Sequence, residues 1–142
     1  MNAGLASPSV HQCRILEFSR IRDPRGVLTP IESCRDVPFE IQRVYYFYEL
    51  EIDASRAGHA HKELQQALIA VSGSFDVHLD DGHERRTVTL NKPYQGLYVP
   101  RMIWRDIDNF TPRSVCVALA SLPYDETDYY REYDEFLRAA GY

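Results

Sequence analysis

The architecture of this chain rests on RAGHAHKELQQALIAVSG, residues 56–73. This stretch places His59 and His61 two residues apart and follows them with an apolar run that ends at Gly73. Alternate residues of a β-strand project to the same face, so both imidazoles are expected to point to one side of a sheet. A second stretch, PRMIWRDIDN at residues 100–109, is the counterpart of the first.

Short apolar segments recur along the rest of the chain and predict further strands. The expected strands are residues 11–18, 27–32, 41–50, 74–79, 86–90, 97–100 and 114–121. The turn Asp80-Asp81-Gly82 joins two of them as a hairpin. In the strand 41–50, alternation puts Arg43, Tyr45 and Phe47 on one face. Many short strands at steady spacing predict an all-β sandwich or barrel that occupies residues 1–142 as one domain.

One helix is expected, near the C-terminus, over residues 126–139. Acidic residues at its start favour a helix N-terminus, and Tyr129, Tyr133 and Phe136 share one face. This segment is therefore interpreted as a packing helix outside the site.

The first stretch fits the first motif of the cupin superfamily, whose fold is a jelly roll. In that motif His-x-His is followed by a Glu and then a Gly. His59, His61 and Gly73 fit, whereas Gln66 stands at the Glu position.

The second stretch fits the second cupin motif in the same partial way. Pro100 and Asn109 match, Met102 replaces a Gly, and Arg105 stands where the motif has a His. A metal cupin uses three imidazoles and a carboxylate, and two of those four ligands are missing here. A neutral amide and a fixed guanidinium make a poor cation site, so no functional metal is expected.

Two inward histidines beside an arginine suit acid–base chemistry. An imidazole exchanges protons near neutral pH, and a guanidinium stabilises an oxyanion. The set formed by His59, His61 and Arg105 predicts proton abstraction next to a carbonyl through an enolate or enediolate. The alternative is that the histidines are ordinary structural residues of a barrel.

Four runs of the sequence resemble the sugar-nucleotide 3,4-ketoisomerases, which act on dTDP-4-keto-6-deoxyglucose. The runs are FEIQRVYY at 39–46, GHAHKE at 58–63, VSGSFDV at 71–77 and YDETDYYREYDEF at 124–136. The similarity covers roughly residues 11–137. It implies a cupin fold, no cofactor, a homodimer that exchanges strands, and movement of the keto group from C4 to C3 of the hexose.

The resemblance also implies roles for particular residues. His59 and His61 become the acid/base pair, with the assignment to C3 and C4 open. Tyr45 is a candidate proton relay or oxyanion donor, with simple packing as the alternative. Candidate substrate-binding residues are Arg25, Arg43, Arg56, Gln66 and Arg105, since guanidinium groups match phosphate oxygens and the Gln66 amide can bond a sugar hydroxyl.

Composition narrows the choice of partners. The 142 residues carry a net charge of −5, which argues against nucleic-acid and anionic-membrane surfaces. The sequence has no signal peptide and no long apolar run, so a cytoplasmic location is expected. Three cysteines without CxxC spacing indicate neither a zinc knuckle nor a disulfide framework.

Three alternatives to the ketoisomerase stay open from the sequence. A keto-sugar 3,5-epimerase uses similar base chemistry in a metal-free cupin, and a non-catalytic cupin could bind the sugar nucleotide without turnover. A metal-dependent oxygenase is disfavoured by Gln66 and Arg105.

Overall fold

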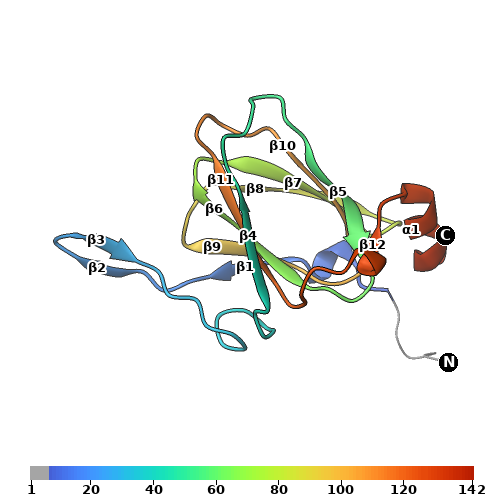
Figure 1. Ribbon diagram of the computed structural model, residues 1–142, viewed down its shortest axis with the longest axis horizontal. Helices are drawn as coiled ribbons and strands as arrows, with labels where there is room; N and C mark the ends of the chain where they lie inside the picture. The colour runs from blue at the N-terminus through green and yellow to red at the C-terminus, as the bar shows by residue number, and fades with distance from the viewer. Residues whose placement is uncertain (1–6) are drawn as a thin grey trace.

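Two five-stranded antiparallel sheets form the body of the molecule in the computed structural model, which describes residues 7–142 (Figure 1). In chain order the elements are η1 (Val10–Gln12), β1 (Arg14–Glu17), β2 (Ile21–Asp23), β3 (Gly26–Leu28), β4 (Arg43–Phe47), β5 (Arg56–His61), β6 (Gln66–Ser72), β7 (Phe75–Asp80), β8 (Arg85–Leu90), β9 (Gln95–Val99), β10 (Trp104–Asp108), β11 (Val115–Ala120), η2 (Glu126–Asp128), β12 (Tyr129–Tyr130) and α1 (Tyr133–Ala140). The all-β prediction with a short C-terminal helix is confirmed.

The sheets have the strand orders β1-β9-β6-β11-β4 and β12-β5-β10-β7-β8. Their inner faces enclose the main core, which includes Leu68, Phe75, Val77, Leu97 and Ile107. The central strand β6 is buried over its first five residues, which explains its uninterrupted apolar sequence. This packing of two sheets is the jelly-roll arrangement that the sequence predicts.

The predicted hairpin after residue 73 is confirmed. Strand β7 pairs with β8 in the register Phe75↔Leu90 through Asp80↔Arg85. Asp81 forms the turn, because its side chain accepts hydrogen bonds from the backbone N–H groups of His83 and Glu84.

The predicted first strand begins later than expected. The backbone over Val10–Gln12 forms a 3₁₀ turn that Ser9 caps, and β1 starts at Arg14. Ser9 accepts from the N–H of His11, which satisfies a donor that a strand would pair with its neighbour.

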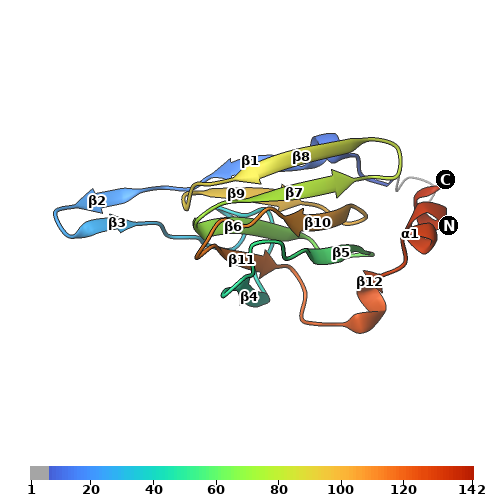
Figure 2. The same ribbon diagram turned by 90° about the horizontal axis from the view of Figure 1, so that it is seen from above.

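The strand predicted at residues 27–32 is also shorter, since β3 ends at Leu28 just before Pro30, which has no N–H to donate. It pairs with β2 as a separate two-stranded hairpin. Figures 1 and 2 both show this β2–β3 hairpin reaching away from the two large sheets.

The predicted helix over residues 126–139 is wrong in its first half. Its N-terminal part is the 3₁₀ turn η2 and the short strand β12, which adds to the edge of β5, and the α-helix begins only at Tyr133. The segment from 121 to 131, which carries η2 and β12, forms a C-terminal strap along this edge. Within the described residues no helix is long and apolar enough to cross a membrane.

Candidate active site

A distortion in β5 sets the position of the two motif histidines. His59 lies opposite Arg105 of β10, and the register between these strands then shifts so that Ala57 faces Asp106. Ala57 and Gly58 both have positive φ angles, 73° and 74°. Such a bulge re-aims the side chains that follow it.

The two imidazoles lie together on the inner side of β5, as the sequence predicts. Their ring centroids are 4.8 Å apart, and the rings are almost perpendicular. Tyr129 of β12 packs against both, at 4.9 Å from the His59 ring and 4.4 Å from the His61 ring. The Nε2 atoms of both histidines are buried and have no hydrogen-bond partner in the part of the chain that the structure describes.

A chain of hydrogen bonds runs from the buried Arg105 to the phenol of Tyr45. The Arg105 guanidinium donates to the carbonyl of Ile103 and to the side-chain oxygen of Gln66. Gln66 donates in turn to the Tyr45 hydroxyl at 3.0 Å. Because that hydroxyl already accepts a bond, its own O–H is free to donate to a ligand.

Burial and positive charge keep both histidines neutral. Burial first, and then the charge of Arg105, lower the pKa of His59 to about 3. The same two causes, in the same order, lower the pKa of His61 far below its ordinary value. Burial also lowers the pKa of Arg105, to about 10, so the guanidinium stays protonated at neutral pH.

The phenol of Tyr45 stays protonated as well. Burial raises its pKa, whereas the hydrogen bond from Gln66 and the charge of Arg105 act in the opposite direction. At neutral pH the site therefore offers two neutral imidazoles as proton acceptors and one phenol as a hydrogen-bond donor.

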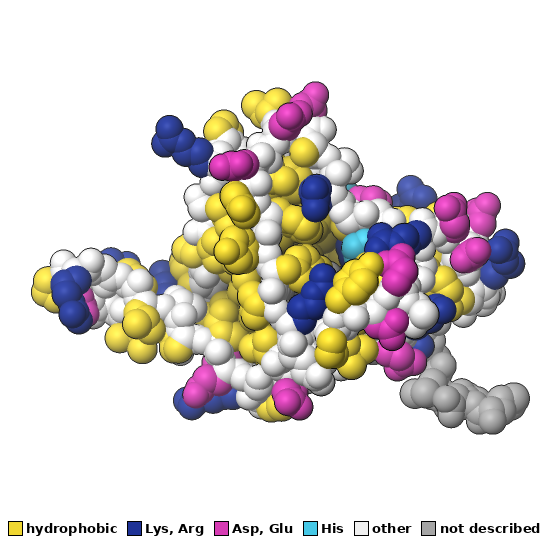
Figure 3. All heavy atoms as spheres, in the orientation of Figure 1, with side chains coloured by type: hydrophobic (Ala, Val, Ile, Leu, Met, Phe, Trp, Pro, Cys, Tyr) yellow, Lys and Arg dark blue, Asp and Glu magenta, His cyan; other side chains and the backbone are white. Residues whose placement is uncertain are grey.

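Three arginines surround a cavity of about 560 Å³ that opens beside His59. Arg43 stacks over Tyr45 at 4.5 Å, and Arg56 stacks over Phe47 at 4.4 Å. The third, Arg131, belongs to the C-terminal strap. Figure 3 shows histidine atoms, in cyan, at the surface of this face, beside basic side chains in dark blue. One guanidinium nitrogen of Arg43 is buried without a partner among the described residues, so it can bind an incoming anionic group.

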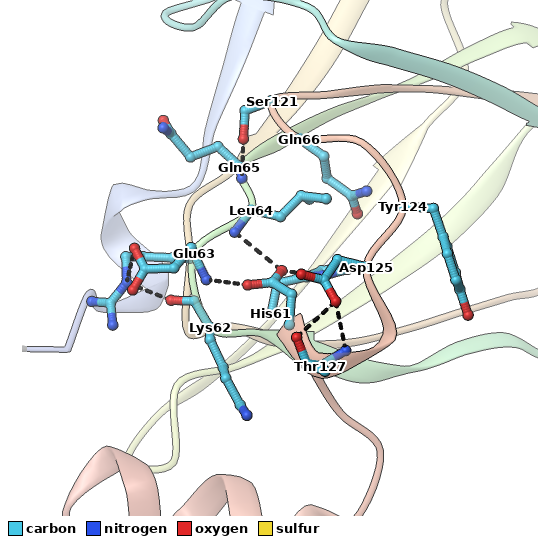
Figure 4. A network of polar contacts seen from close by, with 12 residues as sticks. His61, Lys62, Glu63, Leu64, Gln65, Gln66, Ser121, Tyr124, Asp125 and Thr127 are labelled. Carbon is cyan, nitrogen blue, oxygen red and sulfur yellow. Dashed lines mark hydrogen bonds and ion pairs between the residues drawn. The ribbon is translucent and has the colours of Figure 1, made fainter.

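The C-terminal strap contacts the ring of His61 through the side chain of Asp128. Asp128 Oδ2 lies 3.0 Å from Nδ1 of His61, and the same carboxylate accepts the backbone N–H groups of Glu63 and Leu64. Figure 4 shows how the chain after His61 meets the strap around Asp125 and Thr127. Burial raises the pKa of Asp128, and the two backbone N–H groups oppose that shift.

The structure brings most of the predicted site residues together, some in the wall of the cavity and others buried beneath it. His59, Tyr45, Arg43 and Arg56 line the cavity. Below them lie three buried residues: His61, Gln66 and Arg105.

Arg25 does not reach the cavity of its own chain. It lies in the turn of the β2–β3 hairpin, its side chain is 90% exposed, and it forms an ion pair with Asp23 at 2.7 Å.

Three residues at the site escape prediction from the sequence: Asp128, Tyr129 and Arg131. All belong to the strap, where the acidic and aromatic pattern indicates a packing helix. The remaining histidines lie elsewhere, as expected; His78, for example, bonds to Thr87 and Asp108.

A metal site was not expected, and residues 7–142 contain no group of three His, Cys, Asp or Glu side chains suited to hold an ion. Metal-independent activity stays a prediction.

Comparison with known proteins adds relatives that share both sequence and fold. The family FdtA (WxcM-like, C-terminal) matches residues 11–141. The TDP-4-oxo-6-deoxy-α-D-glucose-3,4-oxoisomerase of Aneurinibacillus thermoaerophilus is 43% identical over 123 residues, which cover 87% of this chain and 88% of that protein.

Solved structures agree with this match. The WlaRB TDP-quinovose 3,4-ketoisomerase from Campylobacter jejuni is 46% identical with a TM-score of 0.86, covering 89% of this chain and 97% of that one. A His-to-Asn variant of the 3,4-ketoisomerase QdtA from Thermoanaerobacterium thermosaccharolyticum, in complex with TDP-4-keto-6-deoxyglucose, is 40% identical with a TM-score of 0.90, covering 93% and 96%. A dTDP-4-dehydrorhamnose 3,5-epimerase from Bacillus anthracis shares the fold at a TM-score of 0.74 with 15% identity, covering 86% and 79%.

Proposed function

The chain belongs to the FdtA (WxcM-like, C-terminal) family, and we propose that it converts TDP-4-keto-6-deoxyglucose into the 3-keto isomer with His59 and His61 as its proton carriers. The enzyme is a TDP-sugar 3,4-ketoisomerase, as are its relatives at 43% and 46% identity. The observation that carries the residue assignment is the pair of neutral imidazoles whose Nε2 atoms have no partner among the described residues.

The reaction needs only proton transfers. A base takes the proton from C3, the C–H electron pair forms the C3=C4 double bond, and the C4 carbonyl oxygen becomes an enediolate oxygen. The O3–H electron pair then forms the C3 carbonyl while the electron pair of the double bond takes a proton at C4. The oxygen on C4 takes the proton that O3 loses, so the product carries a ketone at C3 and a hydroxyl at C4. Atoms and electrons balance without an oxidant.

The residues at the site are suited to the two requirements of this reaction, which are proton transfer and stabilisation of the enediolate oxygen. His59 and His61 are both neutral at the pH of the cell, so each has a ring nitrogen that can accept a proton and later return it. Tyr45 donates a hydrogen bond to the enediolate oxygen from the cavity wall. Arg105 holds Tyr45 through Gln66 and contributes positive charge from below.

The TDP group is expected at the mouth of the cavity. Arg43, Arg56 and Arg131 present guanidinium groups there, and such groups bind phosphate oxygens through paired hydrogen bonds. The aromatic rings under Arg43 and Arg56 fix the directions of these side chains.

A strand-exchanged homodimer is part of this proposal. The β2–β3 hairpin extends from the body, although an isolated two-stranded hairpin is only marginally stable in water. Ile21 and Leu28 on it are 56% and 59% exposed, and the outer face of β4 exposes Val44 and Tyr46. Docking of the hairpin on a second copy covers this apolar surface and carries Arg25 toward the partner's site. The cytoplasmic location stays a prediction.

Substitution of the histidines tests the assignment. We expect His59→Asn and His61→Asn each to lower kcat at least 10²-fold, a usual contribution of general acid–base catalysis, while TDP still binds. The control is His78→Asn, on the outer face of the second sheet, which should keep full activity. NMR of the product locates the ketone; unchanged turnover in both site variants would contradict the assignment.

A further inference from the structure

A buried carboxylate of the C-terminal strap lies directly behind one of the two histidines. Asp128 is 8% exposed, and its Oδ2 lies 3.0 Å from Nδ1 of His61, across 67 residues of sequence. Nothing in the reaction as described above uses this residue.

Three nitrogen atoms surround the carboxylate of Asp128: two backbone N–H groups and Nδ1 of His61. Its Oδ1 accepts the N–H of Glu63 at 2.8 Å, and its Oδ2 accepts the N–H of Leu64 at 3.3 Å. These two backbone donors hold the carboxylate in one orientation. The third neighbour, Nδ1 of His61, therefore meets a fixed acceptor.

The acceptor decides the tautomer of the ring. An ionised carboxylate has no proton to give, so the hydrogen bond requires the proton on Nδ1 of His61. In the neutral imidazole the other nitrogen, Nε2, then carries a lone pair. That Nε2 atom is one of the three buried polar side-chain atoms without a partner in the described chain.

We propose that Asp128 is a positioning residue that holds His61 in the Nδ1–H tautomer, so that Nε2 is the ring atom that accepts and returns the proton. This inference rests on the proposed function, because it gives the tautomer a role in the isomerisation. The carboxylate also stabilises the imidazolium that forms when Nε2 takes a proton.

The contact also makes the two histidines unequal. The ring of His59 is hydrogen bonded to the backbone of Ala57, which is neutral, whereas the ring of His61 faces a carboxylate. The ring of His61 therefore has a carboxylate in direct hydrogen-bond contact, whereas among the described residues no carboxylate bonds to the ring of His59.

The most informative variant is Asp128→Asn. An amide has one acceptor oxygen and an NH₂ group, so it cannot accept from Glu63, Leu64 and His61 in the present geometry. In the orientation that keeps the 2.8 Å bond from Glu63, the NH₂ group faces His61 and favours the Nε2–H tautomer. In the serine-protease triad the equivalent change of tautomer lowers kcat about 10⁴-fold.

The experiment measures the tautomer and the turnover separately. Long-range ¹H–¹⁵N correlation spectra of labelled protein, with His61→Asn to assign the signals, report which ring nitrogen of His61 carries the proton. We expect Nδ1–H in the wild type and loss of that state in Asp128→Asn. We also expect kcat to fall at least 10²-fold with KM changed less than about 3-fold, and Asp128→Glu to recover part of kcat.

Asp125→Asn is the matched control. Asp125 lies three residues earlier on the strap, is exposed, and caps η2, a task that Asn performs equally well. It should leave both the tautomer and kcat unchanged.

Two results would overturn the proposal. One is an Nε2–H tautomer in the wild type, which can be observed even if Asp128→Asn does not fold. The other is an Asp128→Asn protein that keeps the wild-type tautomer and kcat. Failure of the proposed function looks different, because the wild type would then show no ketone migration while the tautomer of His61 is still measured.

Discussion

The charge state of two side chains governs the chemistry of this site. His59 and His61 are held neutral by burial and by a guanidinium that cannot lose its proton at cellular pH. A neutral imidazole is ready to accept a proton, whereas an imidazolium is not. Arg105, at the position of a metal ligand in the cupin motif, thus helps to keep both histidines in the neutral form.

The low pKa of His59 predicts how stability depends on pH. In the unfolded chain a histidine titrates near 6.5, whereas folding lowers the pKa of His59 to about 3. Between these values the unfolded state binds the extra proton, so the free energy of unfolding falls as the pH drops from about 6.5 toward 3.

Denaturant titrations at several pH values check this expectation. The slope of unfolding free energy against pH below 6.5 should be smaller in His59→Asn than in the wild type. Equal slopes in the two proteins would show that His59 does not titrate differently on folding.

Tyr45→Phe removes a hydroxyl and keeps the ring. We expect kcat to fall about 10²-fold with little change in KM, because the hydroxyl acts on the charge that develops in the enediolate. Loss of the partner of Gln66 should also lower stability by about 1–3 kcal/mol. Steady-state kinetics and thermal unfolding measure the two effects.

Tyr48→Phe is the control for this prediction, since Tyr48 is exposed and does not line the cavity. A Tyr45→Phe enzyme as active as this control would assign Tyr45 to packing alone.

At the scale of elements, the C-terminal strap completes the site. The pairing of β12 with β5 places Tyr129 opposite His61 and Tyr130 opposite Ala60. Within the strap, Arg131 forms an ion pair with Glu126, and its guanidinium stacks over the Tyr129 ring at 4.2 Å. The strap thereby forms one wall of the cavity.

The turn between β6 and β7 contains Gly73, where an added side chain should lower the stability of the fold. Gly73 has a φ of +69°, and a Cβ there would lie 2.9 Å from the backbone of Ser114. Gly73→Ala should therefore lower the free energy of unfolding by more than the roughly 1–2 kcal/mol that a left-handed alanine costs.

Gly141→Ala is the matched comparison, since its φ is also positive but no atom lies within 4 Å of the added Cβ. Chemical denaturation measures the free energy of unfolding of both variants. Gly141→Ala reports the cost of the positive φ alone, and any additional loss in Gly73→Ala reports the steric contact of the new Cβ. Equal losses would mean that the contact with Ser114 relaxes freely.

The sequence predicts the histidine strand well and the strap poorly, for a physical reason. His59 and His61 share a face through strand alternation, which is a local property. Tyr129, Tyr133 and Phe136 have helical spacing, but pairing with β5 wins over that local pattern for Tyr129. The contact of Asp128 with His61 spans 67 residues, so no local pattern reports it.

At the scale of the whole molecule, the single chain leaves apolar surface uncovered. Figure 3 shows hydrophobic side chains gathered over the middle of one face. On the hairpin, Ile21 and Leu28 are exposed together with Val27. Exposed apolar patches of this kind mark protein–protein contacts.

A charge on the hairpin should disrupt the proposed dimer. We expect Ile21→Asp combined with Leu28→Asp to give a monomer and to raise KM at least 10-fold, as Arg25 no longer reaches a partner's site. Light scattering and sedimentation equilibrium measure the mass. The control is Tyr142→Asp, an exposed aromatic residue near α1.

A wild-type protein that is monomeric and fully active would contradict the dimer proposal. It would also remove Arg25 from the substrate-binding residues, because its own chain holds it outside the cavity.

The most direct test of the account is to follow TDP-4-keto-6-deoxyglucose by NMR while the enzyme acts on it in D₂O. We predict a new ketone at C3 and deuterium at C4, and the coupling constant at C4 gives the configuration of the product. Deuterium at C3 and C5 with the ketone still at C4 would identify an epimerase. An unchanged sugar despite binding of TDP would contradict catalysis altogether and leave a sugar-nucleotide-binding protein.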